Sequence, residues 1–498
     1  MFVDVRPTSR LRGAKALDVT TSLHPIFQAL CEDTLDLSRL RMVCDWVQYR
    51  NNFREVIDVR AILPASAAVN GVIGMGATDD DIEIAVDLRR CADAALKDVA
   101  QAAIGQYHGS GSGSEPRVFL ESWRPTTQSC IWEFNRLYWQ ALDLWEEATG
   151  QMYESALPGG SSDARNTEAV RELLRDLFAI WDQLAARNAL SDELYVIELG
   201  VGNGNQAKTF LDEFLIVEAV QGRDYYRRLH YLMCDYSPHV LQLARKAVAS
   251  HSDHVSSFVL DATQPTTSLG FLKYKVFLIY VSNVYDNLPT DEVARLGGRS
   301  YRVETRAYLP AAEAGSIASD FSTDLKALPE LVHKLLRLGP ALLSEAAPAH
   351  FGKASDAVEF WSRVWAGLRL TERYAPLVGL DLYRIAPGVS GEMLRPLLES
   401  GGDIRMHVNN GAVASFVDTL PLLHPYGRLL NHDLFVTDTH RYRIGFLGPG
   451  KYEGSVVNWI NGPLLQHIGN RKGFDVRYQP FRHRKGTNIV TMTAQVRD

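Results

Sequence analysis

Three glycines stand at alternate positions in the segment Glu198-Leu199-Gly200-Val201-Gly202-Asn203-Gly204. The apolar run Leu194 to Leu199 predicts a buried strand, and the apolar spacing from Gln206 to Val220 predicts a helix after the loop. Glycines between a strand and a helix N-terminus remove the Cβ atoms that would keep a ligand away from the backbone amides. The spacing is GxGxG, whereas the dinucleotide pattern GxGxxG requires glycine at position 205, which is Asn205. The pattern therefore favours S-adenosylmethionine over NAD, although a glycine turn that only packs a helix on a sheet looks the same.

Acidic residues follow the next two predicted strands. Asp235 comes after the run Leu229 to Cys234, and Asp261 comes after Ser257 to Leu260. Because ligands of parallel sheets bind at the carboxyl ends of the strands, Asp235 is expected to accept hydrogen bonds from ribose hydroxyls and Asp261 from an adenine amino group. Each aspartate has a structural alternative, since Asp also caps helices and forms turns. The expected cofactor site comprises Glu198, Gly200, Gly202, Gly204, Asp235, Tyr236, Asp261, Ala262 and Asn283.

Methyl transfer from a sulfonium is an in-line displacement, so the main task of such a site is to align the nucleophile and exclude water. A general base is optional and depends on the acceptor. The residues placed to act as one lie just past the fourth and fifth predicted strands. They are Tyr285, Asp286, His432 and Asp433. For each, a structural role as a turn, cap or core residue is the alternative.

The elements that must position these residues alternate after Asp192 as short apolar strands and amphipathic helices, which is typical of a parallel sheet with crossover helices. Further strands are predicted at Val276 to Val281 and Arg428 to Phe435. The last two, Phe474 to Tyr478 and Asn488 to Val496, predict an antiparallel hairpin. The fold class expected is α/β, with a doubly wound seven-stranded sheet of the methyltransferase type built from residues 191–295 and 411–498.

The rest of the chain is predicted to be helical. Apolar spacing in Leu37 to Val56 and Ile82 to Ile104 indicates a mostly helical unit over residues 1–120, and residues 121–190 read as a helical lead-in. Residues 296–410 interrupt the strand and helix alternation and are interpreted as a helical insertion that caps the substrate. Two loops rich in glycine and serine are expected, at residues 108–114 and 158–162.

Composition limits the partners. The chain has 498 residues and a net charge of -7, so a large positive field for nucleic acid is not expected. The basic stretch Arg482 to Lys485 is interpreted as a solvated hairpin tip. No signal peptide or membrane-length apolar run is recognised, and the expected location is cytoplasmic. The five cysteines form no CxxC pair, so neither a metal site nor disulfides are expected. They are Cys31, Cys44, Cys91, Cys130 and Cys234.

The segments Val196 to Gly204 and Leu232 to Pro238 resemble those of class I Rossmann-like methyltransferases. Within that class the chain most resembles the MidA-like family, which includes mitochondrial complex I assembly factors that methylate a protein arginine. The supporting segments are Tyr236 to Leu241, Ser282 to Pro289 and Gly427 to Asp433. The resemblance implies a Rossmann-like fold and S-adenosyl-L-methionine as the cofactor.

One departure from the family concerns the acceptor. The family motif after the fourth strand resembles Asn-Glu-x-x-Asp-Ala-Leu-Pro, and the glutamate position is Val284 here. A carboxylate is the natural partner of a guanidinium, so its loss weakens the case for arginine methylation. Three hypotheses stay open: methylation of a small molecule at oxygen, nitrogen or carbon, in secondary metabolism; methylation of a protein; and a non-catalytic cofactor-binding assembly partner. A homodimer is compatible with all three.

Overall fold

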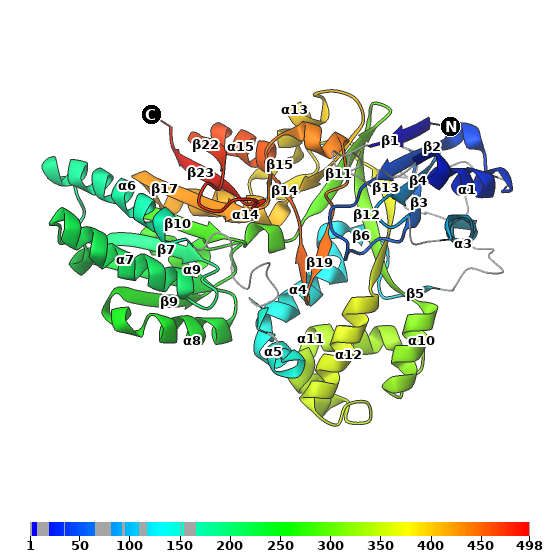
Figure 1. The fold of residues 1–498 in the computed structure, drawn as a ribbon, viewed down its shortest axis with the longest axis horizontal. Helices are drawn as coiled ribbons and strands as arrows, with labels where there is room; N and C mark the ends of the chain where they lie inside the picture. Colours follow the sequence, from blue (N-terminus) through cyan, green and yellow to red (C-terminus); the bar gives the residue numbers. More distant parts are fainter. Residues whose placement is uncertain are drawn as a thin grey trace.

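The computed structural model describes residues 2–6, 19–33, 35–64, 81–91, 95–108, 117–150, 152–153 and 166–497, which build two large β-sheets, three two-stranded sheets and the helices around them (Figure 1). The loop expected at 158–162 and most of that at 108–114 lie outside the described residues. The predicted α/β class is confirmed. No helix among the described residues is long and apolar enough to cross a membrane.

One sheet has seven strands in the order β22-β23-β17-β10-β7-β8-β9. Strands β9, β8, β7, β10 and β17 are mutually parallel, and β23 pairs antiparallel with both β17 and β22. The parallel strands read as nearly continuous apolar runs because helices cover both faces of this sheet. The strands are β7 (Leu194–Leu199), β8 (Leu229–Asp235), β9 (Val255–Val259), β10 (Val276–Ser282), β17 (Leu423–Asp433), β22 (Phe474–Pro480) and β23 (Val490–Val496).

Helices pack on the two faces of the seven-stranded sheet (Figure 1). One face buries apolar side chains of α6 (Thr167–Ala186), α7 (Asn205–Gln221) and α8 (Pro238–Ala247). The other packs against α9 (Thr266–Leu269), α14 (Asn410–Thr419) and α15 (Gly462–Arg471). The carboxyl ends of the parallel strands are therefore the part of this sheet at which loops can form a site.

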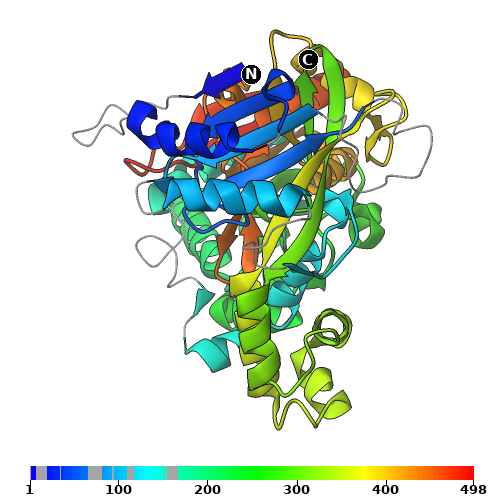
Figure 2. The same ribbon diagram turned by 90° about the vertical axis from the view of Figure 1, so that its right-hand side faces the viewer.

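The other sheet corrects the prediction that residues 1–120 are mostly helical. Five of its ten strands come from that region: β1 (Phe2–Val5), β2 (Leu40–Asp45), β3 (Ile57–Ile62), β4 (Asp81–Asp87) and the short β5 (Arg117–Phe119). Among the residues described there, the long helices are α1 (Val19–Cys31) and α3 (Leu96–His108), and they cover one face of the sheet (Figure 2). The prediction was wrong because short buried apolar runs fit helical and extended periods equally well.

Residues 296–410 are likewise not a purely helical insertion. They contribute β12 (Arg299–Pro310), β13 (Arg369–Pro376) and β16 (Ile404–Val408), which join the N-terminal strands and β11 (Asp291–Leu296) in the ten-stranded sheet. The short strands β5 (Arg117–Phe119) and β6 (Arg124–Pro125) pair with β12. In β12 the buried residues alternate with charged ones, a period of two that marks a strand.

The helical part of that insertion, α10 (Ala311–Asp320), α11 (Leu328–Ala346) and α12 (Ala354–Gly367), packs with α4 (Cys130–Gln140) and α5 (Leu142–Thr149) in a separate core. Helices α4, α5 and α6 agree with the helical lead-in predicted for 121–190. Helix α15 begins at Gly462 because the side chain of Asn461 caps it by accepting from the amide of Leu464 at 3.1 Å.

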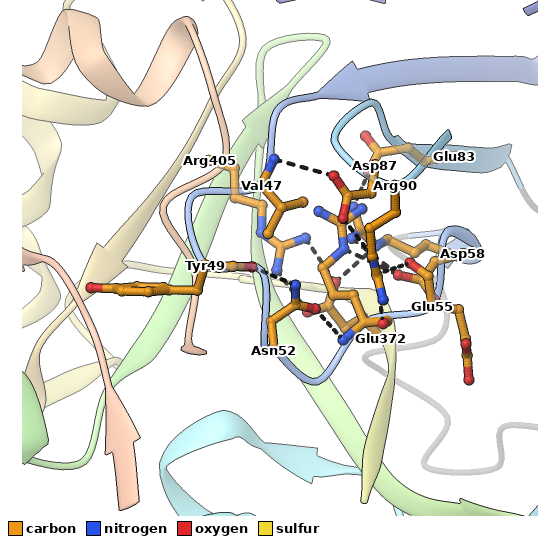
Figure 3. A network of polar contacts seen from close by, with 12 residues as sticks. Val47, Tyr49, Asn52, Glu55, Asp58, Glu83, Asp87, Arg90, Glu372 and Arg405 are labelled. Carbon is orange, nitrogen blue, oxygen red and sulfur yellow. Dashed lines mark hydrogen bonds and ion pairs between the residues drawn. The ribbon is translucent and has the colours of Figure 1, made fainter. Parts of the chain in front are cut away.

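The face of the ten-stranded sheet opposite α1 and α3 carries a ladder of buried charges (Figure 3). Arg60 donates to Glu83 at 2.8 Å and ion-pairs with Glu372 at 2.8 Å, and Arg405 bonds both Glu372, at 2.9 Å, and Glu292, at 2.6 Å. A cavity of about 20 Å³ beside the ladder has room for about one water molecule. We interpret this face as a structural ion-pair network, since arginines match its carboxylates.

Candidate functional site

The glycine loop connects β7 to α7 in a conformation that excludes side chains. Gly202 and Gly204 have φ of +57° and +80°, in the left-handed region. A Cβ on Gly204 would lie 2.6 Å from the Cα of Ala244 in α8, so this glycine is required for helix packing. A Cβ on Gly202 would lie 2.7 Å from the hydroxyl of Tyr153. The packing role therefore holds at Gly204, and at Gly202 a side chain of the chain itself lies against the loop. Close approach of a cofactor to the loop stays a prediction.

Asp235 at the end of β8 lies beside this loop. Its Oδ2 accepts a hydrogen bond from the amide of Gly202 at 3.1 Å, and its Oδ1 accepts from the amide of Ser237 at 3.0 Å. The amide of Gly200 donates to the carbonyl oxygen of Cys234 at 2.8 Å, which fixes the loop against the same strand end. Burial raises the pKa of Asp235 to about 6, although the backbone donors oppose the shift. A carboxylate held in this way can accept further hydrogen bonds from a ligand.

Glu198 lies inside β7 with 2% of its surface exposed. It accepts a hydrogen bond of 2.6 Å from the hydroxyl of Tyr231, on the neighbouring strand β8. Burial and the charge of Glu198 raise the pKa of Tyr231 well above its ordinary value. The buried carboxylate is thus partnered within the sheet, one residue before the glycine loop.

The remaining predicted cofactor residues lie at the same edge of the sheet. Asp261 is exposed, and its Oδ1 accepts from the amide and the hydroxyl of Thr263, both at 2.8 Å, so its turn-forming role is present. Ala262 beside it is half-buried. The hydroxyl of Tyr236 accepts from Nε2 of Gln140 in α4 at 2.8 Å. Asn283 has a positive φ of +52° at the end of β10.

Three of the predicted catalytic residues come together at the ends of β10 and β17. Oδ2 of Asp433 accepts from the amide of Tyr285 at 3.0 Å and from that of Asp286 at 3.4 Å. Oδ1 of Asp286 accepts from Nδ2 of Asn287 at 2.7 Å. The ring of Tyr285 is fully buried in the core under α14, so its backbone and not its side chain faces this pair.

The two carboxyl groups interact with each other. Burial raises the pKa of both Asp286 and Asp433, and the charge of Asp286 raises that of Asp433 further. A hydrogen bond with Asp433 favours the ionised form of Asp286. Both carboxyls therefore take up a proton at a higher pH than an exposed aspartate does.

His432 does not join this pair. Successive side chains of a strand point to opposite faces, so His432 faces away from the side of β17 that carries Asp433. It is 6% exposed, its Nδ1 lies 3.0 Å from the hydroxyl oxygen of Thr491, and its ring contacts Tyr280 and Phe481. Burial lowers its pKa to about 4. These contacts are those of a neutral core histidine.

Two residues near the site were not identified by the sequence analysis. Tyr153, after α5, places its hydroxyl against the glycine loop, and Tyr49, after β2, packs against the core that contains Tyr285. Both come from parts of the chain without a recognisable motif, so no sequence signal pointed to them.

No family model matches the chain, and no curated protein matches it. Solved structures with some similarity include a protein from Burkholderia thailandensis bound to S-adenosylhomocysteine, at 13% identity and a TM-score of 0.43, covering 75% of this chain and 88% of that one. The DszA carbon methyltransferase has 12% identity and a TM-score of 0.33, covering 97% and 93%. The trans-methyltransferase CalH has 14% identity and a TM-score of 0.29, covering 82% and 70%. Similarity at this level assigns no family, and the proposal below depends on the site itself.

Proposed function

We propose that the chain is an S-adenosylmethionine-dependent methyltransferase. The observation that carries the proposal is the hydrogen bond between the carboxylate of Asp235 and the amide of Gly202, at the carboxyl end of β8. It sets a ribose-type acceptor beside the glycine loop, at the carboxyl end of a parallel strand. The order of the seven strands, in which an antiparallel hairpin follows a parallel run, agrees with a methyltransferase sheet.

The cofactor would be held by residues of β7, β8 and the loops after β9 and β10. Asp235 accepts from the ribose hydroxyls, Gly200, Gly202 and Gly204 bring the loop backbone close, and Asp261 lies near the adenine. Glu198, Tyr236, Ala262 and Asn283 complete this side of the site. Gln140 and Tyr153 lie against this side of the site, because Gln140 donates to the hydroxyl of Tyr236 and the hydroxyl of Tyr153 lies against Gly202.

The acceptor is proposed to be a small molecule, in secondary metabolism, methylated at oxygen, nitrogen or carbon. The carboxyl groups that can serve it are enclosed: Asp286 is 5% exposed and Asp433 has no exposed surface. The reacting group of an acceptor must therefore be narrow enough to reach these carboxyl groups. When bound, the cofactor supplies an electrophilic methyl group. The chain orients the acceptor, excludes water and lets Asp286 hold the released proton.

Tyr285 and His432 are not expected to touch the reacting groups. The ring of Tyr285 packs under α14, and His432 packs between Tyr280 and Phe481. We therefore restrict the acid-base role to Asp286, with Asp433 as the residue that orders the loop around it through the amides of Tyr285 and Asp286.

Calorimetry with S-adenosylhomocysteine tests the proposal. We expect binding to the full chain and at least a tenfold loss in Asp235→Ala, because two charge-assisted hydrogen bonds are worth about 1.5–3 kcal/mol each. Asp418→Asn, on the helix side of the sheet, is the matched control and should bind normally. Equal binding of S-adenosylhomocysteine by Asp235→Ala, or tighter binding of NADH, would contradict the assignment.

Transfer of label separates the acceptor classes. Label from methyl-tritiated S-adenosylmethionine in an organic extract would support a small acceptor, and label in a protein band would support protein methylation instead. Tight cofactor binding with no transfer to either fraction would favour a non-catalytic role.

A further inference from the structure

The carboxyl pair of Asp286 and Asp433 is deeply buried and has no cationic partner. The hydrogen bonds that reach it come from the amides of Tyr285, Asp286 and Leu434 and from the side chain of Asn287. In the part of the chain that the structure describes, no lysine, arginine or histidine hydrogen-bonds or ion-pairs with either carboxyl. Burying carboxylates without a counter-charge is costly, so this pair is expected to bind a ligand.

Some other deeply buried carboxylates of the chain are paired with arginine, whereas Glu198 and Asp291 accept hydrogen bonds from tyrosine hydroxyls. In the charge ladder, Arg405 pairs with Glu292 and Arg60 with Glu83, while Glu372 is held between both arginines. Asp286 and Asp433 differ from Glu198 and Asp291 in being neighbours, since the amide of Asp286 donates to Oδ2 of Asp433 at 3.4 Å. This pair lies where β10 and β17 end, which is where a ligand of the parallel sheet would lie.

A third polar group is the hydroxyl of Tyr49, which comes from the loop after β2 and packs against the core that contains Tyr285. Its side chain points away from the charge ladder (Figure 3), and a Cβ on Gly450 would lie 2.4 Å from its Cγ, so the ring is pressed against that glycine. Its hydroxyl is buried and has no hydrogen-bond partner among the described residues. Burial and then the charges of Asp286 and Asp433 raise the pKa of this hydroxyl.

Asn458 adds unmet hydrogen-bonding capacity beside the same loop. Its amide donates to the carbonyl oxygen of Asp286 at 2.8 Å, while neither atom of its buried side-chain amide has a partner among the described residues. Buried polar groups are rarely left unpaired in folded proteins, so these atoms mark a place for a polar ligand or water.

We propose that Asp286, Asp433 and Tyr49 form the acceptor-binding end of the site, and that the acceptor is a small molecule bearing a primary or secondary ammonium group. The proposal rests on the methyltransferase function proposed above. The ammonium supplies the counter-charge that the chain omits, its N–H groups donate to the carboxylates, and Tyr49 accepts or donates the remaining hydrogen bond. The N-terminal unit is then part of the active site, because it supplies Tyr49.

The reaction requires that one proton leaves the ammonium group before the methyl group is transferred. The ammonium gives a proton to Asp286, and the neutral nitrogen uses its lone pair to form the bond to the methyl carbon. The bond between that carbon and sulfur breaks, and its electrons stay on sulfur. The product is an N-methylated ammonium, with the first proton on the carboxyl pair. A role in binding the sulfonium is disfavoured, because carboxylates beside a charge that disappears in the reaction would stabilise the ground state.

The test is calorimetry on the full chain saturated with S-adenosylhomocysteine. The probes are methylammonium, n-butylammonium and benzylammonium, each with the corresponding alcohol as its neutral match. We expect at least one ammonium probe to bind about tenfold more tightly than its alcohol. Asp286→Asn should weaken that binding about tenfold, and Tyr49→Phe about threefold, from the usual strengths of charged and neutral hydrogen bonds. Tyr426→Phe, at an exposed tyrosine, is the control and should change nothing.

Binding of S-adenosylhomocysteine itself should be the same in all three variants, which shows that each is folded and separates this proposal from the previous one. Equal or tighter binding of the alcohols would overturn the proposal, as would ammonium binding that Asp286→Asn leaves unchanged, or no binding of any ammonium probe at tens of millimolar. Failure of the unaltered chain to bind S-adenosylhomocysteine would instead overturn the methyltransferase function.

Discussion

Binding of S-adenosylhomocysteine should weaken as the pH falls below about 6, because of Asp235. Burial raises the pKa of this carboxyl to about 6 in the free chain, against the opposing hydrogen bonds from the amides of Ser237, Gly202 and Tyr236. Only the ionised carboxylate can accept from two ribose hydroxyls with both oxygens. The ligand therefore selects the ionised form, and protonation competes with binding.

The magnitude follows from this linkage. When the ligand binds only the ionised form, the apparent dissociation constant rises by a factor of one plus the ratio of protonated to ionised carboxyl. At about pH 8 this factor is close to one, and at about pH 5 it is about tenfold, or about 1.4 kcal/mol. Below the pKa, each further pH unit should cost another factor of about ten.

Calorimetry at several pH values between about 5 and 8 measures this dependence. Asp235→Asn is the matched control, because an amide keeps an acceptor for the loop amide but cannot titrate in this range. It should bind weakly and with little dependence on pH. A flat profile in the unaltered chain, or an equally steep one in Asp235→Asn, would refute the assignment of Asp235 to the ribose.

The remaining predictions concern stability and are measured by urea unfolding. Gly204→Ala should lower the free energy of unfolding by more than the roughly 1–3 kcal/mol of left-handed strain, because the added Cβ would lie 2.6 Å from the Cα of Ala244. Gly222→Ala, at a φ of +62° and with open space around it, should lose only the strain energy. Similar losses in the two variants would contradict the packing role of Gly204. Glu372→Gln should cost about 3–5 kcal/mol at neutral pH by leaving two buried arginines without their carboxylate. Burial alone would raise the pKa of Glu372, but the two arginines hold this pKa well below the ordinary 4.5. The stability that Glu372 contributes is therefore present above about pH 4.5 and is lost as the pH falls toward the folded pKa. If the loss of stability at acidic pH were the same in the variant, this reasoning would be contradicted. Lys451→Met should cost about 3 kcal/mol, because the ammonium donates to the carbonyl oxygens of Trp365, Ala366 and Leu368, and a loss below about 1 kcal/mol would show that water replaces it.

The elements of the seven-stranded sheet could be read from the sequence because each is a short apolar run followed by a turn. Strand β7 has the predicted bounds, and the helix predicted from Gln206 to Val220 is α7 with one more residue at each end. The position of Asp235 beside the glycine loop follows from the same reasoning, since parallel strands end at one edge.

The ten-stranded sheet could not be read in this way. Its strands alternate apolar residues with charged ones that are themselves buried, such as Arg60 and Glu83, and a buried charge is explained only by its partner on another strand. The approach of Tyr49 to Asp286 also depends on how the two sheets pack, which no local pattern encodes. The sequence named Tyr285 and His432 as catalytic candidates because it located strand ends but could not tell which face each side chain takes.

A crystal structure with S-adenosylhomocysteine is the decisive measurement, because every role proposed for the site depends on where the cofactor lies. We expect both ribose hydroxyls within hydrogen-bonding distance of Asp235, the adenine beside Asp261, and the sulfur directed toward Asp286. A ligand bound away from the loop of residues 198–204, or a sulfur directed away from the ends of β10 and β17, would contradict it.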